Sequence, residues 1–487
     1  MIAECFADPT PPDQCMTVMS LRWLKLGVVA VLAACASGNG SNSGSGRRDP
    51  LRSYDPEHPA VSGNASEFAT IYGRMGLAAS GPPLFFVGDV AYFATRSPDT
   101  TLVIVGLSLP NRGLVFKREP GGYSASYAVD LSLTGSAGVV AQSRDSESVR
   151  VATFKETSRT DESVIYRRVF RAAPGAYSLT YAVRDGNSQR SAERQLTVAV
   201  PRLTSSGLST PASVYEVEPR TRLDSAPVYL PAPRASYVFG VDDSASVYLE
   251  SYNPRSPISM EVRTPDGKIA WQGMRTLSPR SAGLASGVVT VPLSHADVGI
   301  GTIVATQAGS SDTLGMRMFI GFGPDLPVLS FREMLGYLRY FRAPRQLQPL
   351  YDAKPEERGA RWATFLRETD PNPSTPQNEA LDDYFNRIRD ANSLFVSDSP
   401  PGWLSDRGMV FVALGAPTNS YEDYGSMYMG DIAVQGQLST RVKILIWEYS
   451  QYQTRIIFYD PNDTRQWRLT RPSMSVFQSL LARTTNR

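Results

Sequence analysis

The sequence predicts a multidomain β plus α+β protein, in which two β-sandwich modules precede a helical segment and a small α+β domain with an antiparallel sheet. Two observations predict this order. From about residue 67 to residue 327, hydrophobic and polar residues alternate with the period of a half-buried strand, and at Ser330 the period changes to that of a helix. The 487 residues and the 42% hydrophobic content allow two to four domains with cores of their own.

The first β module is predicted over residues 67–200. In YSASYAVDLSL (123–133), every second residue from Ala125 onward is apolar, as in an antiparallel strand with one buried face. At 172–188, a Pro-Gly turn, a strand and an Asp-Gly-Asn turn follow one another, a pattern that resembles strands of immunoglobulin-like sandwiches. The spacing of strands and turns favours about seven strands.

The second β module is predicted over residues 202–327, where the alternation continues and Pro265-Asp266-Gly267 marks a hairpin turn. The remaining residues, 328–487, begin with three amphipathic helices. Their predicted start signals are Ser330, Pro355 and the pair Thr375-Pro376.

After SDSPP (397–401), the pattern predicts a small sheet. We expect the following elements in order: a short apolar strand from Met409 to Leu414, a polar loop over 418–440, a hairpin of strands 442–449 and 454–460, and a final short helix from Ser473.

Residues 19–35 are typical of a secretory signal, with a basic start and an apolar stretch too short to span a bilayer. The end of this segment resembles a bacterial lipobox, formed by Leu32, Ala33, Ala34 and Cys35. That resemblance implies cleavage before Cys35 and diacylation of its sulfur, whereas an ordinary signal peptide with a chance cysteine is the alternative. Ala36 after the cysteine favours the outer membrane, by resemblance to lipoprotein sorting.

Two further N-terminal segments are predicted to lie outside the fold. Residues 1–18 fit no signal design, and we interpret them as an extension upstream of a start at Met16 or Met19. Residues 36–66 are rich in Gly, Ser and Pro, and we expect a disordered tether.

Composition excludes several function classes. Lys and Arg number 49 against 47 Asp and Glu, a balance that argues against a nucleic-acid partner. Histidine occurs only at His58 and His295, and cysteine only at Cys5, Cys15 and Cys35. Because imidazole and thiolate are the usual zinc and transition-metal ligands, we expect no metal site of that kind and no cofactor. A Ser-His-Asp triad is also disfavoured, since no G-x-S-x-G motif is present.

The most specific motif lies in GWLSDRGMVFVALGAP (402–417). The motif residues are Gly402, Trp403, Asp406, Arg407, Gly408, Gly415 and Pro417, together with Trp447 and Tyr449 of the later WEY. With the approach segment 370–392, they resemble the GWxTD-domain family of bacterial proteins, for which the resemblance implies no assigned activity. Ser405 stands where the family name has Thr, and Ala416 where many members carry an acid. The LGxP…WxY pattern is also similar, more weakly, to SmpA/OmlA-type outer-membrane assembly lipoproteins.

The motif has two interpretations. In a catalytic one, Asp406 is an acid or base and Arg407 an anion clamp. In a structural one, Ser405–Gly408 form a turn, Trp403 fills the core, and Arg407 pairs with Asp406 or another acid. We expect the structural role, so the catalytic residues are unknown.

Two other acidic groups are weaker candidates. Asp382 and Asp383 are helix neighbours and do not face one another, as catalytic carboxylates do. The Asp460-Asn462-Asp463 group lacks the Ca²⁺-loop pattern, and a turn is expected there.

The sequence therefore predicts a non-enzymatic lipoprotein of a diderm bacterium. Lipid on Cys35 would hold it in the outer membrane, facing the periplasm or the cell surface, where it would act as an interaction or scaffolding module for another envelope protein. The candidate partner surface is aromatic and consists of Tyr421, Tyr424, Met427 and Tyr428. The alternatives are a carboxylate-based glycan-active enzyme and an assembly factor similar to the SmpA/OmlA group. The identity of the partner and the oligomeric state stay open.

Overall fold

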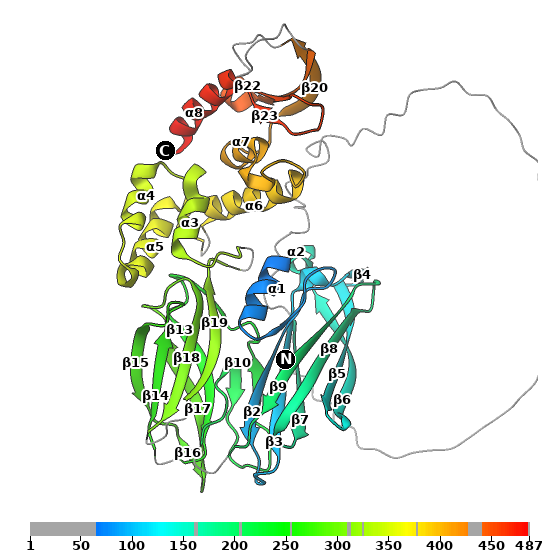
Figure 1. Cartoon of the computed structure of the whole chain (residues 1–487), viewed down its shortest axis with the longest axis vertical. Coiled ribbons are helices and arrows are strands. Elements are labelled where there is room, and N and C mark those ends of the chain that lie inside the picture. Colours follow the sequence, from blue (N-terminus) through cyan, green and yellow to red (C-terminus); the bar gives the residue numbers. More distant parts are fainter. Residues whose placement is uncertain are drawn as a thin grey trace, which may run out of the picture. The chain divides into compact units, whose positions relative to one another are not determined.

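The computed structural model describes residues 65–159, 164–203, 207–253, 256–308, 313–323, 326–375, 378–426 and 441–485 (Figure 1). All of these lie in the second of two compact units, residues 49–487. The predicted signal peptide, lipobox and tether lie outside the described residues, as do Met427 and Tyr428. None of the described helices has the length and apolar character needed to cross a membrane. The fold is mostly β, with several antiparallel sheets and some helices, which confirms the predicted class at that level.

The first β module consists of two sheets that pack on one core. One sheet has the order β1 (Ala78–Ala79), β2 (Val87–Ala94), β3 (Thr101–Leu109) and β7 (Val164–Ala172). The other has β4 (Lys117–Glu119), β5 (Gly122–Gly135), β8 (Gly175–Asp185) and β9 (Ser191–Val200), with β6 (Gly138–Val151) paired to β5. A short helix, α2 (Phe154–Thr157), follows β6. The alternation read from the sequence decides this packing, since Val129, Leu131 and Leu133 of β5 are fully buried in the shared core with Val105 and Leu107 of β3.

The second β module repeats this arrangement with different connections. One sheet has the order β11 (Val228–Pro231), β10 (Ala212–Glu218), β13 (Ser244–Ser251), β17 (Leu284–Pro292) and β16 (Pro279–Ser281). The other has β12 (Ser236–Val238), β19 (Thr313–Gly321), β18 (Gly299–Gln307), β14 (Ile258–Arg263) and β15 (Ile269–Arg275). The predicted hairpin at residue 266 joins β14 to β15, and among the described strands of this module only β12 with β19 is parallel.

The two β modules share a small apolar core, and a buried ion pair of the second module bonds a backbone carbonyl of the first. Phe93 and Ile104 of the first module pack with Val214, Tyr229 and Tyr248 of the second.

The ion pair joins Arg220 to Glu250, whose side chains are 1% and 0% exposed. Two nitrogens of Arg220 donate to Glu250 at 2.8 and 2.6 Å, and the same guanidinium donates to the carbonyl of Ala94 at 2.7 Å. A charge buried this deeply is stable only while its partner is present.

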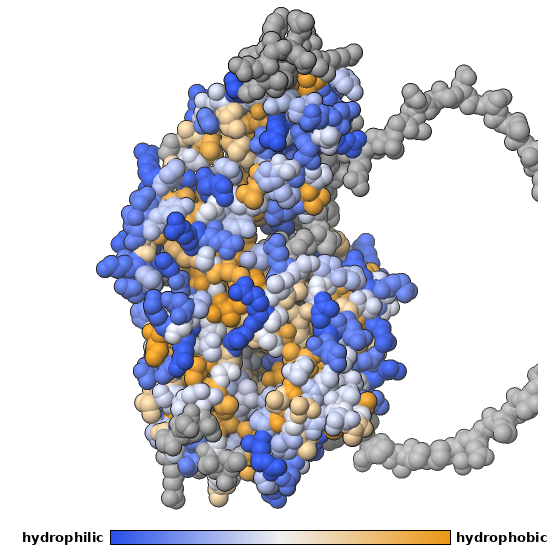
Figure 2. Space-filling view, viewed as in Figure 1, coloured by the Kyte–Doolittle hydropathy of each residue, from blue (hydrophilic) through white to orange (hydrophobic). Residues whose placement is uncertain are grey.

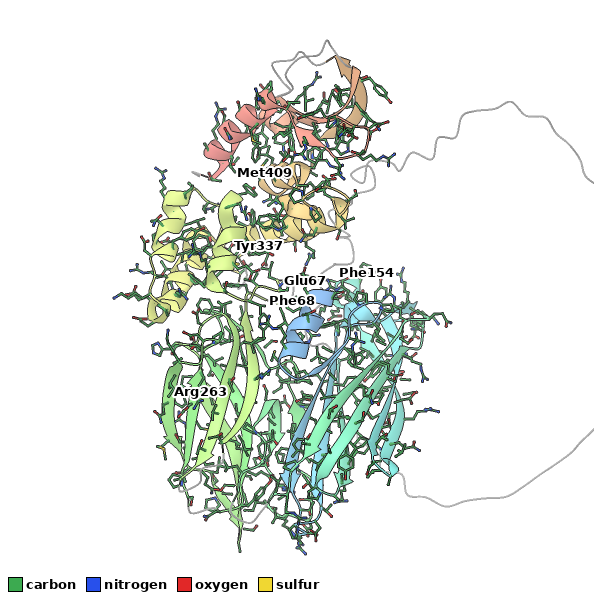
Figure 3. The ribbon with its side chains drawn as sticks, viewed as in Figure 1. Glu67, Phe68, Phe154, Arg263, Tyr337 and Met409 are labelled. Atoms are coloured by element: carbon green, nitrogen blue, oxygen red, sulfur yellow. The ribbon has the colours of Figure 1, made fainter. Side chains whose placement is uncertain are left out.

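The sequence analysis missed the first helix, α1 (Ala65–Arg74), because residues up to 66 were assigned to the tether and those from 67 to the first β module. Phe68, Ile71, Tyr72 and Met75 follow a helical spacing and pack against Val87 and Phe319, so α1 contacts both β modules (Figure 3 marks Phe68). That spacing was the signal that could have identified the helix.

The C-terminal part is α+β. Its helices are α3 (Phe331–Tyr337), α4 (Pro344–Tyr351), α5 (Pro355–Thr369), α6 (Glu379–Leu394), α7 (Asp406–Leu414) and α8 (Arg471–Thr485), with one-turn 3₁₀ helices at Leu338–Tyr340 and Gly402–Leu404. Its sheet has the order β20 (Asn419–Ser426), β21 (Arg441–Tyr449), β22 (Thr454–Asp460) and β23 (Arg468–Leu469), all antiparallel. The helices are amphipathic, and Figure 2 shows a mostly hydrophilic surface over α4 and α5.

Four predictions for this part are wrong. Helix α4 was not expected, so four described helices precede α7 where three were predicted. Residues 409–414 form the end of α7 instead of a strand, because Val410, Phe411 and Val412 are all fully buried and a short run that is apolar throughout carries no period. Residues 419–426, expected in a loop, form β20, which pairs with β21 through eight residues. The third helix begins at Glu379 behind the N-cap Asn378, three residues after the expected Thr375-Pro376 start.

We predict that Glu250→Gln lowers the free energy of unfolding by about 3–5 kcal/mol, because it leaves the charge of Arg220 buried without a counter-charge. Urea denaturation followed by circular dichroism measures this. The matched control is Glu119→Gln in the exposed pair with Arg150, whose side chains are 39% and 79% exposed and whose loss should change stability far less. Equal losses in the two variants would contradict the structural role of the buried pair.

Candidate functional site

The candidate site is the turn that joins α6 to α7, where the sequence motif lies. Gly402 opens the turn with a φ of +66°, and a Cβ there would lie 3.0 Å from the Cα of Asn392 on α6. The side-chain oxygen of Asn392 accepts a hydrogen bond from the backbone N–H of Trp403 at 3.1 Å. Glycine at 402 therefore lets the turn press directly on α6.

Trp403 is 7% exposed and packs among aromatic rings. Its indole stacks on Tyr337 of α3 with centroids 4.8 Å apart and planes at 17°, and Tyr340 meets it edge-on at 6.3 Å (Figure 3 marks Tyr337). The guanidinium of Arg339 lies 4.5 Å from the ring centroid, a cation–π contact. Trp403 thus joins α3 to the turn.

The polar residues of the motif build the start of α7. The hydroxyl of Ser405 accepts from the N–H of Gly408 at 2.9 Å, as an N-cap does, and donates to the carbonyl of Gly402 at 2.7 Å. A Cβ on Gly408 would lie 2.7 Å from the Cα of Trp403 and closer still to the Gly402 carbonyl oxygen. Serine supplies here the hydroxyl that the threonine of the family name would supply.

Arg407 and Asp406 hold α7 from two sides. Arg407 binds Asp398 through two hydrogen bonds of 2.9 and 2.5 Å, in a pair whose side chains are 5% and 2% exposed. Asp406 accepts from the backbone N–H of Leu469 in β23 at 2.7 Å. The alternative of an Arg407–Asp406 pair is therefore wrong, and another nearby acid takes that place.

The later motif residues attach the sheet to the same core. Gly415 ends α7 with a φ of +82°, and its carbonyl accepts from the hydroxyl of Tyr449 at 3.0 Å. Burial raises the pKa of Tyr449 well above its usual range, which keeps the hydroxyl protonated as a donor. Trp447 is fully buried, with its ring 4.7 Å from Phe458. Pro417 lies in the short segment between α7 and β20.

Comparison with known families identifies the domain that contains this turn. The model of the GWxTD domain matches residues 305–428. The chain contains a GWxTD domain. Comparison with curated protein sequences gives no match.

Solved structures resemble the chain only distantly. The BSP domain of a biofilm-associated protein is 8% identical, with 55% of this chain and 54% of that chain covered and a TM-score of 0.16. Native E. coli alpha-2-macroglobulin is 10% identical, with 50% and 17% covered and a TM-score of 0.17. The fibronectin(III)-like modules of Clostridium thermocellum CbhA are 11% identical, with 48% and 94% covered and a TM-score of 0.12. The chain thus spans about half of the first of these chains and less than a fifth of the second, and TM-scores this low assign neither fold nor activity to it.

Two acidic residues that the sequence analysis singled out, Asp383 and Asp460, make structural contacts. Asp460 is 2% exposed, and its carboxylate accepts backbone N–H groups of Asn462, Thr464 and Arg465, so it holds the turn after β22. Asp383 pairs at 3.5 Å with Arg387 one turn further along α6. In the described part of the chain, no three His, Cys, Asp or Glu residues come together as a metal site would require.

One carboxyl near Trp403 has a perturbed pKa. Burial raises the pKa of Glu67 on α1 above its ordinary value of 4.5, and the negative charge of Glu333 on α3 adds to the rise. Burial and the same two carboxylates raise the pKa of Tyr337, which stacks on Trp403. These groups link α1 to the aromatic cluster around Trp403, and no reaction is assigned to them.

Of the predicted aromatic partner surface, the described residues include only Tyr421 and Tyr424. In the antiparallel register, Tyr421 lies opposite Ile446 and Tyr424 opposite Lys443, which places the two tyrosines on opposite faces of the sheet. Tyr421 donates to Glu448 at 3.1 Å, and Tyr424 is 57% exposed.

Sequence reasoning missed a second row of apolar side chains. Ile444 and Ile446 of β21, with Ile457 and Tyr459 of β22, share the face of Tyr421 and are half-buried. The run VKILIWEY was the available signal, because a strand that is apolar on both faces is typical of a sheet covered on both sides.

We predict that Trp403→Ala lowers the free energy of unfolding by about 3–5 kcal/mol, the usual range for a buried large aromatic residue. Thermal and urea unfolding of the purified chain measure this. Leu404→Ala is the matched control, since Leu404 is 48% exposed and its truncation should change stability by less than about 0.5 kcal/mol. An unchanged melting temperature in Trp403→Ala would return the catalytic interpretation of the motif.

Proposed function

We propose that this protein is a lipid-anchored interaction module of the bacterial envelope, whose C-terminal sheet binds a protein partner. The anchor is the lipid on Cys35, in the outer membrane, with the folded part facing the periplasm or the cell surface. The two β modules act as immunoglobulin-like spacers between the anchor and the sheet.

The observation that supports partner binding is the face of the sheet that points away from the helices. On the inner face, Leu445, Trp447, Ile456 and Phe458 are at most 1% exposed and belong to the main core. On the other face, Tyr421, Ile446 and Ile457 form one cross-strand row, and Ile444 with Tyr459 form the next. We call these five residues the outer apolar face. They lie outside the hydrophobic clusters of the described residues.

The chemistry of this face favours an amphipathic helix of the partner as its ligand. Neighbouring strands are about 4.8 Å apart, so the two rows form a flat apolar band across the sheet. One edge of the band carries the ion pair of Arg455 with Glu448 at 2.8 Å, and the other carries Arg468 opposite Tyr459. A helix with an apolar stripe and mixed flanking charges matches a flat band of this kind, as the helices of the inner face do.

A crosslinking experiment tests the binding surface. A photoreactive phenylalanine at Tyr459, on the outer apolar face, should form one discrete adduct in cells, with the crosslink in an amphipathic helical segment of another envelope protein. Ile446→Glu should abolish the adduct, because it places a charge in the centre of the band, and should leave the melting temperature unchanged.

Val288→Glu is the matched control for that experiment, since Val288 is 42% exposed on β17 of the second β module and the adduct should persist. Three results would refute the proposed partner. They are the absence of an adduct, an adduct that survives Ile446→Glu, and an adduct only with lipid or with a second copy of this chain.

The anchor has a separate test. Cys35→Ala removes the only sulfur that the lipobox can acylate, so the variant should leave the outer-membrane fraction and appear in the soluble envelope fraction. Flotation of membranes on a density gradient measures the distribution. If the variant still floats with the outer membrane, Cys35 is not the anchor.

A further inference from the structure

A cavity of about 340 Å³ lies where the second β module meets the helical segment. Val238, Val241 and Phe322 line it from the β module, and Trp362, Leu381 and Phe385 from α5 and α6. This volume is at the lower end of the range for ligand pockets, which are mostly apolar with a few polar groups. The cavity is remote in sequence from the outer apolar face, and ligand binding there does not depend on the proposed function.

The deep wall of the cavity is a fixed aromatic cluster. Trp362 meets Phe322 edge-on with centroids 5.0 Å apart and stacks on Phe365 at 5.4 Å. Gly240 has a φ of +72°, and a Cβ there would lie 2.8 Å from Cδ1 of Trp362. The backbone of the β module thus presses on the indole, which holds the wall in place without a ligand.

The rim of the cavity is also held in place. Asn378 donates from its amide to the carbonyl of Leu366 at 2.8 Å and to the hydroxyl of Thr369 at 2.9 Å, both at the end of α5. Its side-chain oxygen accepts from the N–H of Leu381 at 3.0 Å and so caps α6. Because one side chain joins the end of α5 to the start of α6, the opening between the two helices is preformed.

The charges at the rim are two carboxylates and one guanidinium, those of Asp370, Asp382 and Arg367. Arg367 donates to Thr364 of its own helix at 3.1 Å. Asp370 accepts from the N–H of Asn372 through Oδ1, while its Oδ2 makes no hydrogen bond within the described residues. The rim therefore has one more negative than positive charge and a carboxylate oxygen with acceptor capacity beside an apolar interior.

We propose that this cavity binds a ligand with an apolar body, about the size of an indole ring, that carries a cationic group. The ring packs against Phe322 and Phe385, which are half-buried, and the cation pairs with Asp370 at the rim. Two sources supply this chemistry: a free aromatic amine, or a peptide in which a bulky apolar residue stands beside a lysine or arginine.

Calorimetric titration of the full chain with three indoles of matched size tests the charge preference. Tryptamine is a cation, tryptophol is neutral and indole-3-acetate is an anion. We expect tryptamine to bind most tightly, tryptophol less tightly and indole-3-acetate most weakly. Asp370→Asn should weaken tryptamine binding about tenfold, which corresponds to about 1.4 kcal/mol, and should leave tryptophol binding unchanged. A blocked Trp-Lys dipeptide represents the peptide ligand. If it binds more tightly than tryptamine, the ligand is a peptide; if tryptamine binds more tightly, the ligand is a free aromatic amine.

A matched pair of variants tests the location. Val241 at the cavity and Val228 on β11 are both 59% exposed, so Val241→Trp and Val228→Trp make the same change at equal exposure. Val241→Trp should block tryptamine binding, and Val228→Trp should bind as the unmodified chain does. Three results would overturn the proposal: equal binding by the two variants, no binding of any cationic probe, or equal affinities for indole-3-acetate and tryptamine.

Discussion

The close approach of Gly408 to the carbonyl of Gly402 is the constraint on which the C-terminal domain depends. Neither position has room for a Cβ, so the chain turns back on itself within seven residues, and Ser405 can bond both glycines. This turn points Trp403 toward α3 and Arg407 toward Asp398. The two contacts lie on different sides of α7, and together they fix its direction. The sheet then attaches through Asp406 and Tyr449, whose hydrogen bonds reach β23 and the end of α7.

The residues matched to the GWxTD domain begin inside the second β module, and the core of that module continues into the helices. The matched residues start at 305, within β18, and one core continues from that module through α3 and α5 to the sheet of β20–β23. Asp297 of the β module pairs with Arg358 of α5 at 2.5 Å, and Gly299 presses on the carbonyl of Leu329. The boundary predicted at residues 327 and 328 stays a prediction, but the core crosses it without a break. The β module is in physical terms part of the platform on which the GWxTD turn is built.

The success of sequence reasoning here depended on whether a signal was local. Alternation in β5 and the stripe of α6 are local, and both elements were predicted. The burial of Trp403 also followed from residue type. The run 409–414 misled because an all-apolar segment fits a buried helix or a buried strand equally, and β20 was missed because its pairing with β21 depends on residues about twenty positions away. The partner of Asp406 lies 63 residues along the chain at Leu469, which no pattern in either segment indicates.

Because the motif residues bond one another, the two binding surfaces that we propose lie outside the motif. The outer apolar face is flat and the cavity at α5 and α6 is concave, so the two suit ligands of different shape. They are nevertheless mechanically related through α6. Leu381 and Phe385 line the cavity, while Asn392 holds the Gly402 turn, about 10 to 16 Å further along the same helix at 1.5 Å per residue. Any ligand that shifts α6 at the cavity acts on the turn directly, since Gly402 has no free space against Asn392.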